Sequence, residues 1–387
     1  MTNMSKQELI KTIKPRYLKS RKKGKTVILN EFCRNAGYSR KYAIEILRAK
    51  CDYRRVARIG RKPRARIYDS RVLAAAIKIW ELLEYPCGAR LQPMLLPALE
   101  ALTRCRELSV SDDIRDKLKA ISAKTLDRRL AKERELRRLK RNRGTTRRGS
   151  LLKSAIPVRI TDWDTGEIGF MEMDTVAHNG GDPSGEHIYS LDMAEISSGW
   201  SEQIAVMGKG ERGIVSAVNE IKSVVPFKLQ GLDSDGGSEF INWHMVRYCE
   251  RAGLFFTRSR PDRKNDNAYV EQKNYTHIRQ RLGYGRYDTA AQLRMINDLY
   301  RQELRLFSNF FRPVMKILSK EKINNSVCRK KYDQAKTPYQ RLMESGQIGE
   351  EQKMKLKELY LSLNPVQLRK AIDEKIEKIK KTQIKQS

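Results

Sequence analysis

The stretch GEIGFMEMDTVAH, residues 166–178, decides the fold of this chain. Its side chains alternate with the period of a β-strand, in which successive residues point to opposite faces. Ile168 and Phe170 belong to one face, and Met171 and Met173 belong to the other. The pattern therefore predicts a buried strand, and the residues on either side of it decide which kind of sheet it joins.

Strands and helices follow this strand in a regular order. The order is β-β-β-α-β-α-β-α, which is typical of a mixed five-stranded sheet flanked by helices. We therefore expect an α/β core. The expected segments are strands at 187–196 and 199–207, a helix at 210–225, a strand at 227–237, a helix at 238–253, a strand at 254–259 and a helix at 265–282.

Three acidic residues stand where these elements meet. Asp174 ends the first strand, Asp235 ends the fourth, and Glu271 lies on the last long helix, with 35 residues between Asp235 and Glu271. Adjacent strands bring their ends to one edge of a sheet, and carboxylate oxygens are the ligands that Mg²⁺ prefers. Two Mg²⁺ ions about 3.5–4 Å apart can activate an attacking oxygen and stabilise a leaving oxygen. The pattern predicts such a two-metal site, in which Mn²⁺ is able to replace Mg²⁺.

Other acids close to these three have alternative interpretations. Asp233 shares the face of Asp235 if the strand stays regular, so it is the chief competitor for the second ligand position. We interpret Asp192, which also follows a strand, as structural. Glu239 begins a helix and suits its dipole, and Asp266 suits the cap of the helix that carries Glu271.

Five segments carry a family resemblance: MEMDTVAHNG, HIYSLDMAE, SDGGSEFIN, FTRSRPDRKNDNAYVEQKN and NFFRPVMK. Together they resemble bacterial insertion-sequence transposases of the retroviral integrase superfamily, which share a D…D-x35-E triad. The similarity covers roughly residues 156–315, and Gly236 stands where the family often has Asn. It implies a ribonuclease H-like core in which Asp174, Asp235 and Glu271 are both catalytic residues and metal ligands. It also implies transposition: DNA strand cleavage and strand transfer by a homo-oligomer assembled on DNA.

The charge of the chain is strongly positive and unevenly distributed. Lys and Arg number 79 against 46 Asp and Glu, so the formal net charge is +33. Residues 1–150 hold 41 basic and 15 acidic residues, a net charge of +26, and the remainder carries only +7. Such self-repulsion favours a polyanionic partner. We expect double-stranded DNA, both the terminal repeats of a mobile element and its target, with no membrane partner.

A helix-turn-helix motif is predicted within residues 28–48. Apolar residues recur with helical spacing on both sides of a break, where Gly37 can end the first helix and Ser39 can cap the second. In such motifs the second helix enters the major groove. An ordinary helical hairpin with a basic surface is the alternative. The candidate DNA-binding residues of this motif are Arg40, Lys41 and Arg48.

A second set of candidate DNA contacts surrounds Glu271. Asn274 and Arg279 follow it by three and eight residues, which puts them near its face of the helix. Arg263 and Lys264 precede the helix. We expect these four to hold the phosphates at the cleavage point, although a solvated basic face fits the pattern equally well.

Changes in composition divide the chain into six regions. Basic stretches that contain Gly or Pro read as linkers. For the second helical region, a charge-rich helix without DNA contact is the alternative. The expected regions are a helix-turn-helix DNA-binding domain at 1–53, a basic linker at 54–68, a second helical DNA-binding domain at 69–140, a basic linker at 141–155, the integrase-type catalytic core at 156–315, and a helical C-terminal region at 316–387.

Several classes of protein are disfavoured. The six cysteines and four histidines lack zinc-finger spacing, and the first 60 residues hold no histidine, so the zinc module of a retroviral integrase is not expected. No run of 18 apolar residues and no signal peptide is visible. We expect a bacterial cytoplasmic protein associated with the nucleoid. A ribonuclease H-type nuclease, or a DNA-binding regulatory protein with an inactive core, is the alternative function.

Overall fold

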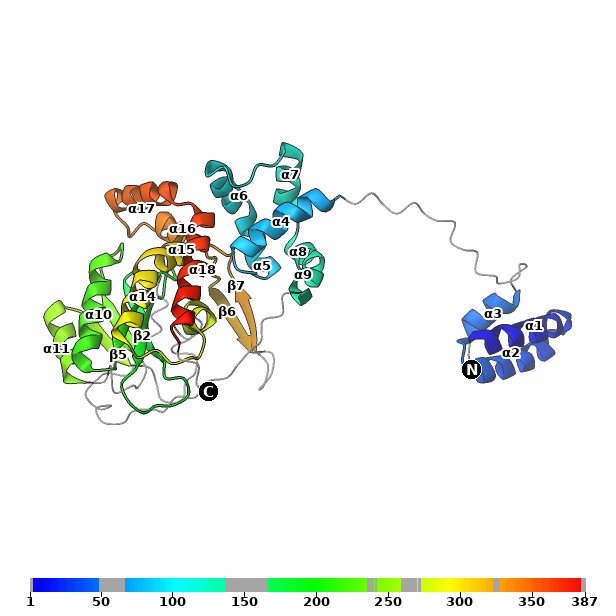
Figure 1. The fold of residues 1–387 in the computed structure, drawn as a ribbon. Helices are drawn as coiled ribbons and strands as arrows, with labels where there is room; N and C mark the ends of the chain where they lie inside the picture. Colours follow the sequence, from blue (N-terminus) through cyan, green and yellow to red (C-terminus); the bar gives the residue numbers. More distant parts are fainter. Residues whose placement is uncertain are drawn as a thin grey trace. The chain divides into compact units, whose positions relative to one another are not determined.

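The computed structural model describes residues 3–48, 67–136, 166–234, 240, 242–258, 270, 273–322 and 328–383. The chain folds into two units, Met1–Ile67 and Tyr68–Ser387 (Figure 1). Four of the predicted site residues lie outside the described residues: Asp235, Arg263, Lys264 and Glu271.

The first unit is a bundle of three helices around a small apolar core. Gly37 has a φ of 68° and its N–H bonds to the carbonyl of Cys33, so it ends the second helix as the sequence predicts. The Oγ atom of Ser39 accepts from the N–H of Tyr42 over 3.4 Å at the start of the third. Phe32 and Leu47 are fully buried between them. The helices are α1 (Asn3–Lys19), α2 (Lys22–Ala36) and α3 (Arg40–Arg48).

The second unit begins with short helices that pack around Trp80. Asp69 caps the first of them by accepting from the N–H groups of Arg71 and Val72. Ser122 caps a later one by accepting from the N–H of Thr125. The elements are α4 (Ser70–Leu82), α5 (Gly88–Leu91), η1 (Gln92–Met94), α6 (Leu95–Arg104), α7 (Asp112–Ala120), α8 (Ala123–Arg129) and α9 (Ala131–Leu136).

A five-stranded mixed sheet lies at the centre of this unit, in the strand order β3-β2-β1-β4-β5. The first three strands pair antiparallel, whereas β4 runs parallel to β1 and β5 runs parallel to β4. This confirms the mixed sheet that the order of elements predicts. The strands are β1 (Phe170–Ala177), β2 (Ile188–Glu195), β3 (Ser201–Met207), β4 (Gly231–Ser234) and β5 (Phe255–Arg258).

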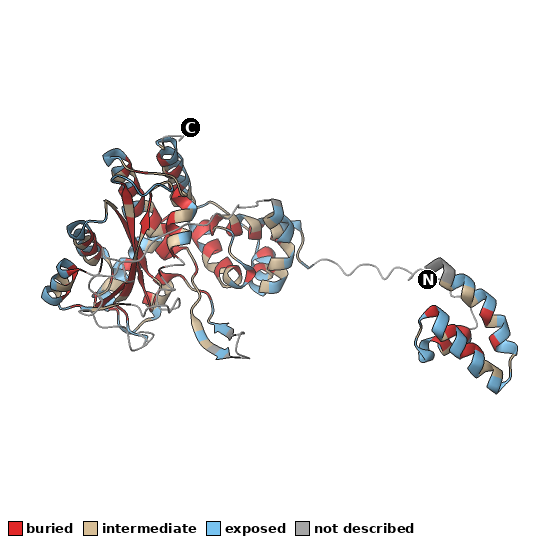
Figure 2. Cartoon of the chain, turned by 90° about the horizontal axis from the view of Figure 1, so that it is seen from below, coloured by how far each residue is buried: buried red, intermediate tan, exposed pale blue. Residues whose placement is uncertain are grey.

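Helices cover both faces of the sheet (Figures 1 and 2). On one face, Met171 and Met173 pack in a buried cluster with residues of α10 (Glu211–Val224) and α11 (Trp243–Ala252). The other face packs against a run of helices that follows residue 273. That run comprises η2 (Asn274–Arg279, π-helical), α13 (Gln280–Leu282), α14 (Ala290–Leu299), η3 (Tyr300–Leu304, π-helical) and α15 (Arg305–Phe310).

The C-terminal region differs from its sequence prediction at its start. It was expected to be helical from residue 316, because Lys and Glu favour helices. Instead an antiparallel hairpin precedes the helices, and Asn324 and Asn325, which favour turns, separate its two strands in the sequence. The elements are β6 (Ile317–Lys322), β7 (Cys328–Tyr332), α16 (Pro338–Glu344), α17 (Glu350–Ser362) and α18 (Pro365–Lys381).

A buried ionic cluster joins three parts of the second unit. Glu84, just beyond α4, has a side chain that is only 3% exposed and pairs with Arg281 of α13, Arg312 and Arg369 of α18. The distance from Arg312 Nε to Glu84 Oε2 is 3.1 Å. Burial by itself raises the pKa of Glu84, but the charges of these three arginines outweigh it and hold that pKa below 4.5. Residues 68–136 thus share one compact unit with the sheet and the C-terminal helices.

None of the helices in the described ranges is long and apolar enough to cross a membrane.

Candidate active site

Four carboxylates lie on the sheet face that is turned away from α10 and α11. Glu172 and Asp174 alternate with Met171 and Met173 along β1, so they point to the opposite side. The antiparallel register pairs Asp174 with Asp192 on β2. On the other side of β1, the parallel register pairs Glu172 with Asp233 on β4. Directly opposed residues share a face, so the sheet gathers all four acids on one side.

Asp174 differs from its three neighbours in exposure. Glu172, Asp192 and Asp233 are fully buried, whereas Asp174 is half-buried and can be reached from solvent. Its Oδ1 atom accepts from the N–H of Thr175 over 2.7 Å, and its Oδ2 atom accepts from Asn274 Nδ2 over 2.6 Å. These two bonds hold the carboxylate in one orientation at the surface of the sheet.

Two contacts dock the helical segment that follows β5 onto β1. The N–H of Val270 donates to Glu172 Oε2 over 3.2 Å, and Asn274 bonds to Asp174 as described above. Sequence reasoning assigned Asn274 to DNA, and the structure brings it to Asp174. Val270 and Asn274 therefore both contact the strand that carries Asp174.

Asp233, the competitor for a metal-ligand position, is held by the next strand. Its Oδ1 atom accepts from the hydroxyl of Thr257 on β5 over 2.5 Å, inside the sheet. The last described pair between β1 and β4 is Met173 with Ser234. Asp235 is the next residue in the sequence, and it lies outside the described residues.

Asp192 belongs to a buried polar network behind Asp174. Its Oδ1 atom accepts from Gln203 Nε2 over 2.8 Å, and the same Nε2 lies 3.3 Å from His277 Nδ1 on η2. Burial raises the pKa of Asp192 to about 7, although the bond to Gln203 and the charge of Lys273 oppose the shift. Its contacts therefore run to β3 and η2, in keeping with a structural interpretation.

Lys273 is a buried cation that sequence reasoning missed. It is only 7% exposed, and its Nζ atom donates to the carbonyl of Gly199 in the turn between β2 and β3. Burial lowers its pKa to about 8, while the nearby carboxylate of Asp192 opposes the shift. No sequence signal marked this lysine, because Lys residues are common on helices and few are buried. It ties the segment that carries Asn274 to the far end of the sheet.

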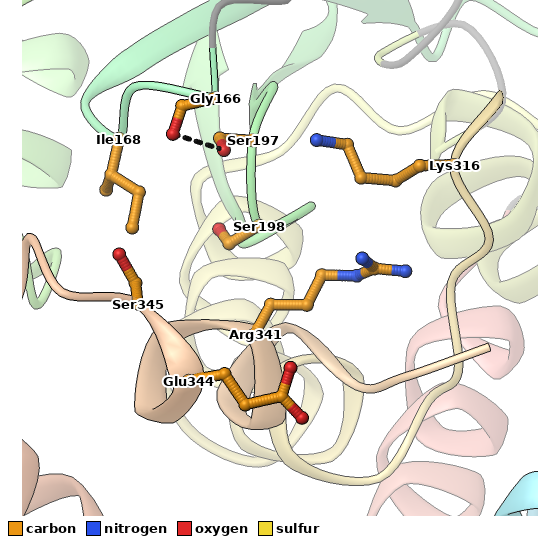
Figure 3. A pocket seen from close by; sticks show the side chains of 8 residues that line it. All are labelled: Gly166, Ile168, Ser197, Ser198, Lys316, Arg341, Glu344 and Ser345. Atoms are coloured by element: carbon orange, nitrogen blue, oxygen red, sulfur yellow. Dashed lines mark hydrogen bonds between the residues drawn. The ribbon is translucent and has the colours of Figure 1, made fainter. Parts of the chain in front are cut away.

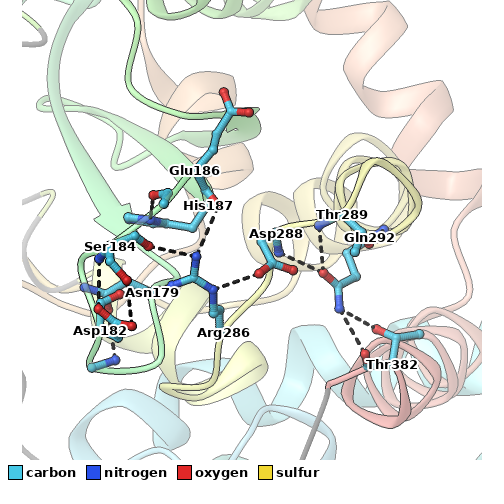
Figure 4. Close-up of polar contacts among 12 residues, drawn as sticks. Asn179, Asp182, Ser184, Glu186, His187, Arg286, Asp288, Thr289, Gln292 and Thr382 are labelled. Carbon is cyan, nitrogen blue, oxygen red and sulfur yellow. Dashed lines mark hydrogen bonds and ion pairs between the residues drawn. The ribbon is translucent and has the colours of Figure 1, made fainter.

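The loop after β1 is fixed by Arg286 (Figure 4). Its guanidinium donates to the carbonyls of Asp182, Ser184 and Glu186 over 3.1, 2.9 and 3.3 Å, and its Nε bonds to Asp288 Oδ2 over 2.7 Å. One arginine thus satisfies three carbonyls that a turn cannot satisfy by itself. These bonds hold the loop that follows β1, the strand of Asp174, against the segment before α14.

The remaining candidate DNA contacts fall on two separate surfaces. Arg40 and Lys41 are exposed in the first turn of α3, and Arg48 is its last residue. Arg40 Nη1 donates to Asn30 on α2. Arg279 is partly buried, with its guanidinium over the ring of Tyr284 at 4.9 Å. None of these positions is joined to Asp174 by a described contact.

No metal cluster is complete within the described ranges. In that part of the chain, no group of three or more His, Cys, Asp and Glu side chains is arranged to hold an ion. Two of the three acids that the sequence assigns to the metals, Asp235 and Glu271, lie outside it. The described oxygen donor is Asp174, whose chemistry suits Mg²⁺.

Comparison with known proteins gives one relative along most of the chain. No protein-family model matches. Two solved structures are similar at low sequence identity. The catalytic core domain of BIV integrase is 15% identical, and the match covers 44% of this chain and 91% of that chain with a TM-score of 0.29. The HTLV-2 integrase catalytic core domain in complex with magnesium is 14% identical, and the match covers 38% of this chain and 88% of that chain with a TM-score of 0.28. The uncharacterized protein y4rM of Sinorhizobium fredii (strain NBRC 101917 / NGR234) is 36% identical over 333 residues, which cover 84% of this chain and 92% of y4rM. The chain therefore belongs to the same family as y4rM.

Proposed function

We propose that the protein is a DNA transposase, which binds the ends of a mobile element, cuts a DNA strand there and joins the end to target DNA. Asp174, Asp235 and Glu271 are the proposed catalytic residues. The observation that carries the proposal is the docking of residues 270 and 274 onto β1. An acid at position 271 belongs to a segment whose neighbours bond to Glu172 and to Asp174 itself.

The register of β4 supports the second acid. Met173 pairs with Ser234 at the carboxyl end of β4. If the parallel register continued by one residue, Asp235 would stand opposite Asp174 and on the same face. Asp233, by contrast, is fully buried and bonded to Thr257. The burial of Asp233 favours Asp235 as the second ligand.

The donor set fits two Mg²⁺ ions, with Mn²⁺ as a substitute. Asp174, Asp235 and Glu271 would supply only carboxylate oxygens, which hard divalent cations prefer. When bound, two such ions would lower the pKa of an attacking water or 3′-hydroxyl and stabilise the leaving oxygen. The chain itself orients the half-buried carboxylate of Asp174 through Asn274 and Thr175. It also anchors the segment around position 271 through the buried ammonium of Lys273.

The charge of the chain supports DNA as the substrate. The net charge of +26 on residues 1–150 would attract a polyanion, and α3 offers the exposed Arg40 and Lys41 to a major groove. We extend the proposal to sequence-specific recognition of element ends by the first unit, and to a homo-oligomer that brings two ends together. Arg263, Lys264 and Arg279 are proposed to contact phosphates beside the cleavage point.

A strand-transfer assay tests this function. The full-length protein is incubated with a labelled DNA end and a plasmid target, in Mg²⁺, in Mn²⁺ and in chelator. We expect joined products with either ion and none in chelator. DNA binding without any cleavage or joining in either ion would reject the transposase and favour a regulatory DNA-binding protein. Cleavage of an RNA–DNA hybrid without joining would favour a ribonuclease H-type nuclease.

A further inference from the structure

The hairpin of β6 and β7 is a two-stranded ribbon that projects from the body of the second unit (Figure 2). An isolated two-stranded hairpin is at best marginally stable in water. In the described part of the chain no third strand pairs with it, and open strand edges favour association with another molecule. Two large side chains on it are exposed, Leu318 at 63% and Tyr332 at 45%.

The ribbon is strongly basic. Residues 316–332 include six Lys and Arg and a single acid, Glu321. The register pairs Lys320 directly with Lys330 and pairs Ser319 with Lys331. Lys330 and Lys331 are both exposed, so an anionic partner could reach them.

The base of the ribbon is firmly held. The backbones of Lys316 and Asp333 bond to each other over 2.9 Å, and the Asp333 carboxylate pairs with Arg341 of α16 over 2.7 Å. Arg341 also donates to the carbonyl of Val314 over 3.1 Å. An open hollow of about 300 Å³ adjoins this base, and in Figure 3 Lys316 extends across it toward Ser197. The hollow leaves room for an anionic chain beside Lys316.

The base is also tied to the candidate active site. Arg312, four residues before Lys316, donates from Nη1 to the carbonyl of Thr276 over 3.1 Å. Thr276 belongs to η2, the segment in which Asn274 bonds to Asp174. A molecule bound along the ribbon would therefore be held at a fixed position relative to Asp174.

We propose that the β6–β7 hairpin is a second DNA-binding element, which contacts the phosphate backbone of the duplex held at the active site. The inference rests on the proposed function for the identity of its partner. A two-stranded ribbon fits the groove of B-DNA, and its lysines would neutralise phosphates without reading sequence. The lysines also protect exposed edges against self-association, which is the simpler explanation of their presence.

The test reverses the charge of the ribbon in the full-length chain. Lys330→Glu with Lys331→Glu keeps the edge charged, so protection against self-association is retained while attraction to phosphate is lost. The matched control is Lys355→Glu with Lys357→Glu, two exposed positions on α17 that give the same change in net charge. Binding to duplex end DNA is measured by anisotropy in chelator at several salt concentrations. Because no catalysis is involved, the result stands apart from the strand-transfer assay.

We expect the hairpin variant to lose affinity by at least about tenfold and its log–log salt slope to fall by about 2, since each phosphate contact contributes roughly 0.9. The control should change the slope far less. Equal affinity and equal slope in the two variants would overturn the proposal. If the hairpin variant fails to fold, a photo-crosslinking residue in place of Leu318 decides: it should capture bound DNA, whereas one in place of Met354 on α17 should not. Failure to crosslink at 318 under saturating DNA would also reject it.

Discussion

Asn274 donates a hydrogen bond from its Nδ2 atom to Oδ2 of Asp174 over 2.6 Å, joining the segment after residue 270 to the central strand of the sheet. The two residues are 100 positions apart in the sequence. The other oxygen of this carboxylate, Oδ1, accepts a hydrogen bond from the N–H of Thr175, so the orientation of the carboxylate is fixed at both oxygens. Outer groups that orient a ligand in this way strongly affect the metal it holds.

Replacement of Asn274 by Ala should slow strand cleavage about 10- to 100-fold in Mg²⁺, because Asp174 is a proposed metal ligand and loss of a bond that orients a ligand typically costs that much. DNA affinity in chelator should be unchanged. Single-turnover cleavage and anisotropy measure the two quantities. Asn219→Ala is the control, since Asn219 is exposed and accepts a long hydrogen bond of 3.5 Å from Tyr248. A wild-type cleavage rate for the Asn274 variant would show that this bond does not support catalysis.

Glu84→Gln should lower the free energy of unfolding by about 3–5 kcal/mol, because it leaves Arg281 and Arg312 largely buried without their counter-charge. Urea unfolding followed by circular dichroism gives the value. The control is Glu100→Gln, which removes an exposed pair with Arg115 and should cost less than about 1 kcal/mol. Equal stability losses in the two variants would remove Glu84 from the centre of the cluster.

The same carboxylate predicts a dependence of stability on pH. The pKa of Glu84 is held below 4.5 in the folded protein, so folding favours its charged form. Its contribution is complete above the unfolded-state pKa of 4.5 and is lost as the pH falls through the lower, folded-state pKa. The stability difference between the wild type and Glu84→Gln should therefore shrink as the pH falls from about 6 to about 3. A difference that stays constant over this range would contradict the assignment.

Replacement of Arg40 and Lys41 by Ala in the full-length chain tests the first unit. If these exposed residues of α3 read bases, the ratio of affinities for end DNA and scrambled DNA should fall. If they contact only phosphates, both affinities should fall alike and the salt slope should decrease by about 2. Titrations of both DNAs at several salt concentrations separate the cases. No change with either DNA would exclude this helix face from binding.

Local patterns in the sequence predict much of the architecture. The alternation around Met171 and Met173 gives the central strand, and the order of elements gives the mixed sheet. Gly37 and Ser122 end or cap helices where their chemistry suggests, because capping depends only on a few neighbouring residues. Such features need no knowledge of how distant segments meet.

Contacts between distant segments could not be predicted in this way. Glu84 meets Arg281, Arg312 and Arg369 only because three parts of the chain pack together, and each of these residues reads as an ordinary surface charge in the sequence. The bond between Asn274 and Asp174 could not be predicted for the same reason. The hairpin was missed because its Lys and Glu residues favour helices, while its pairing depends on a base held by Arg341.

We propose that Asp174, Asp235 and Glu271 hold the metal ions needed to cut and join DNA. The most direct measurement is strand transfer by Asp174→Asn, Asp235→Asn and Glu271→Gln in Mg²⁺, beside Asp233→Asn as the control for a buried acid of the same sheet. We predict that the first three variants lose cleavage and joining while binding end DNA like the wild type, and that Asp233→Asn, once shown to be folded, still joins DNA. Retained strand transfer by any of the first three would contradict the claim, and loss of it in Asp233→Asn alone would move the second ligand from Asp235 to Asp233.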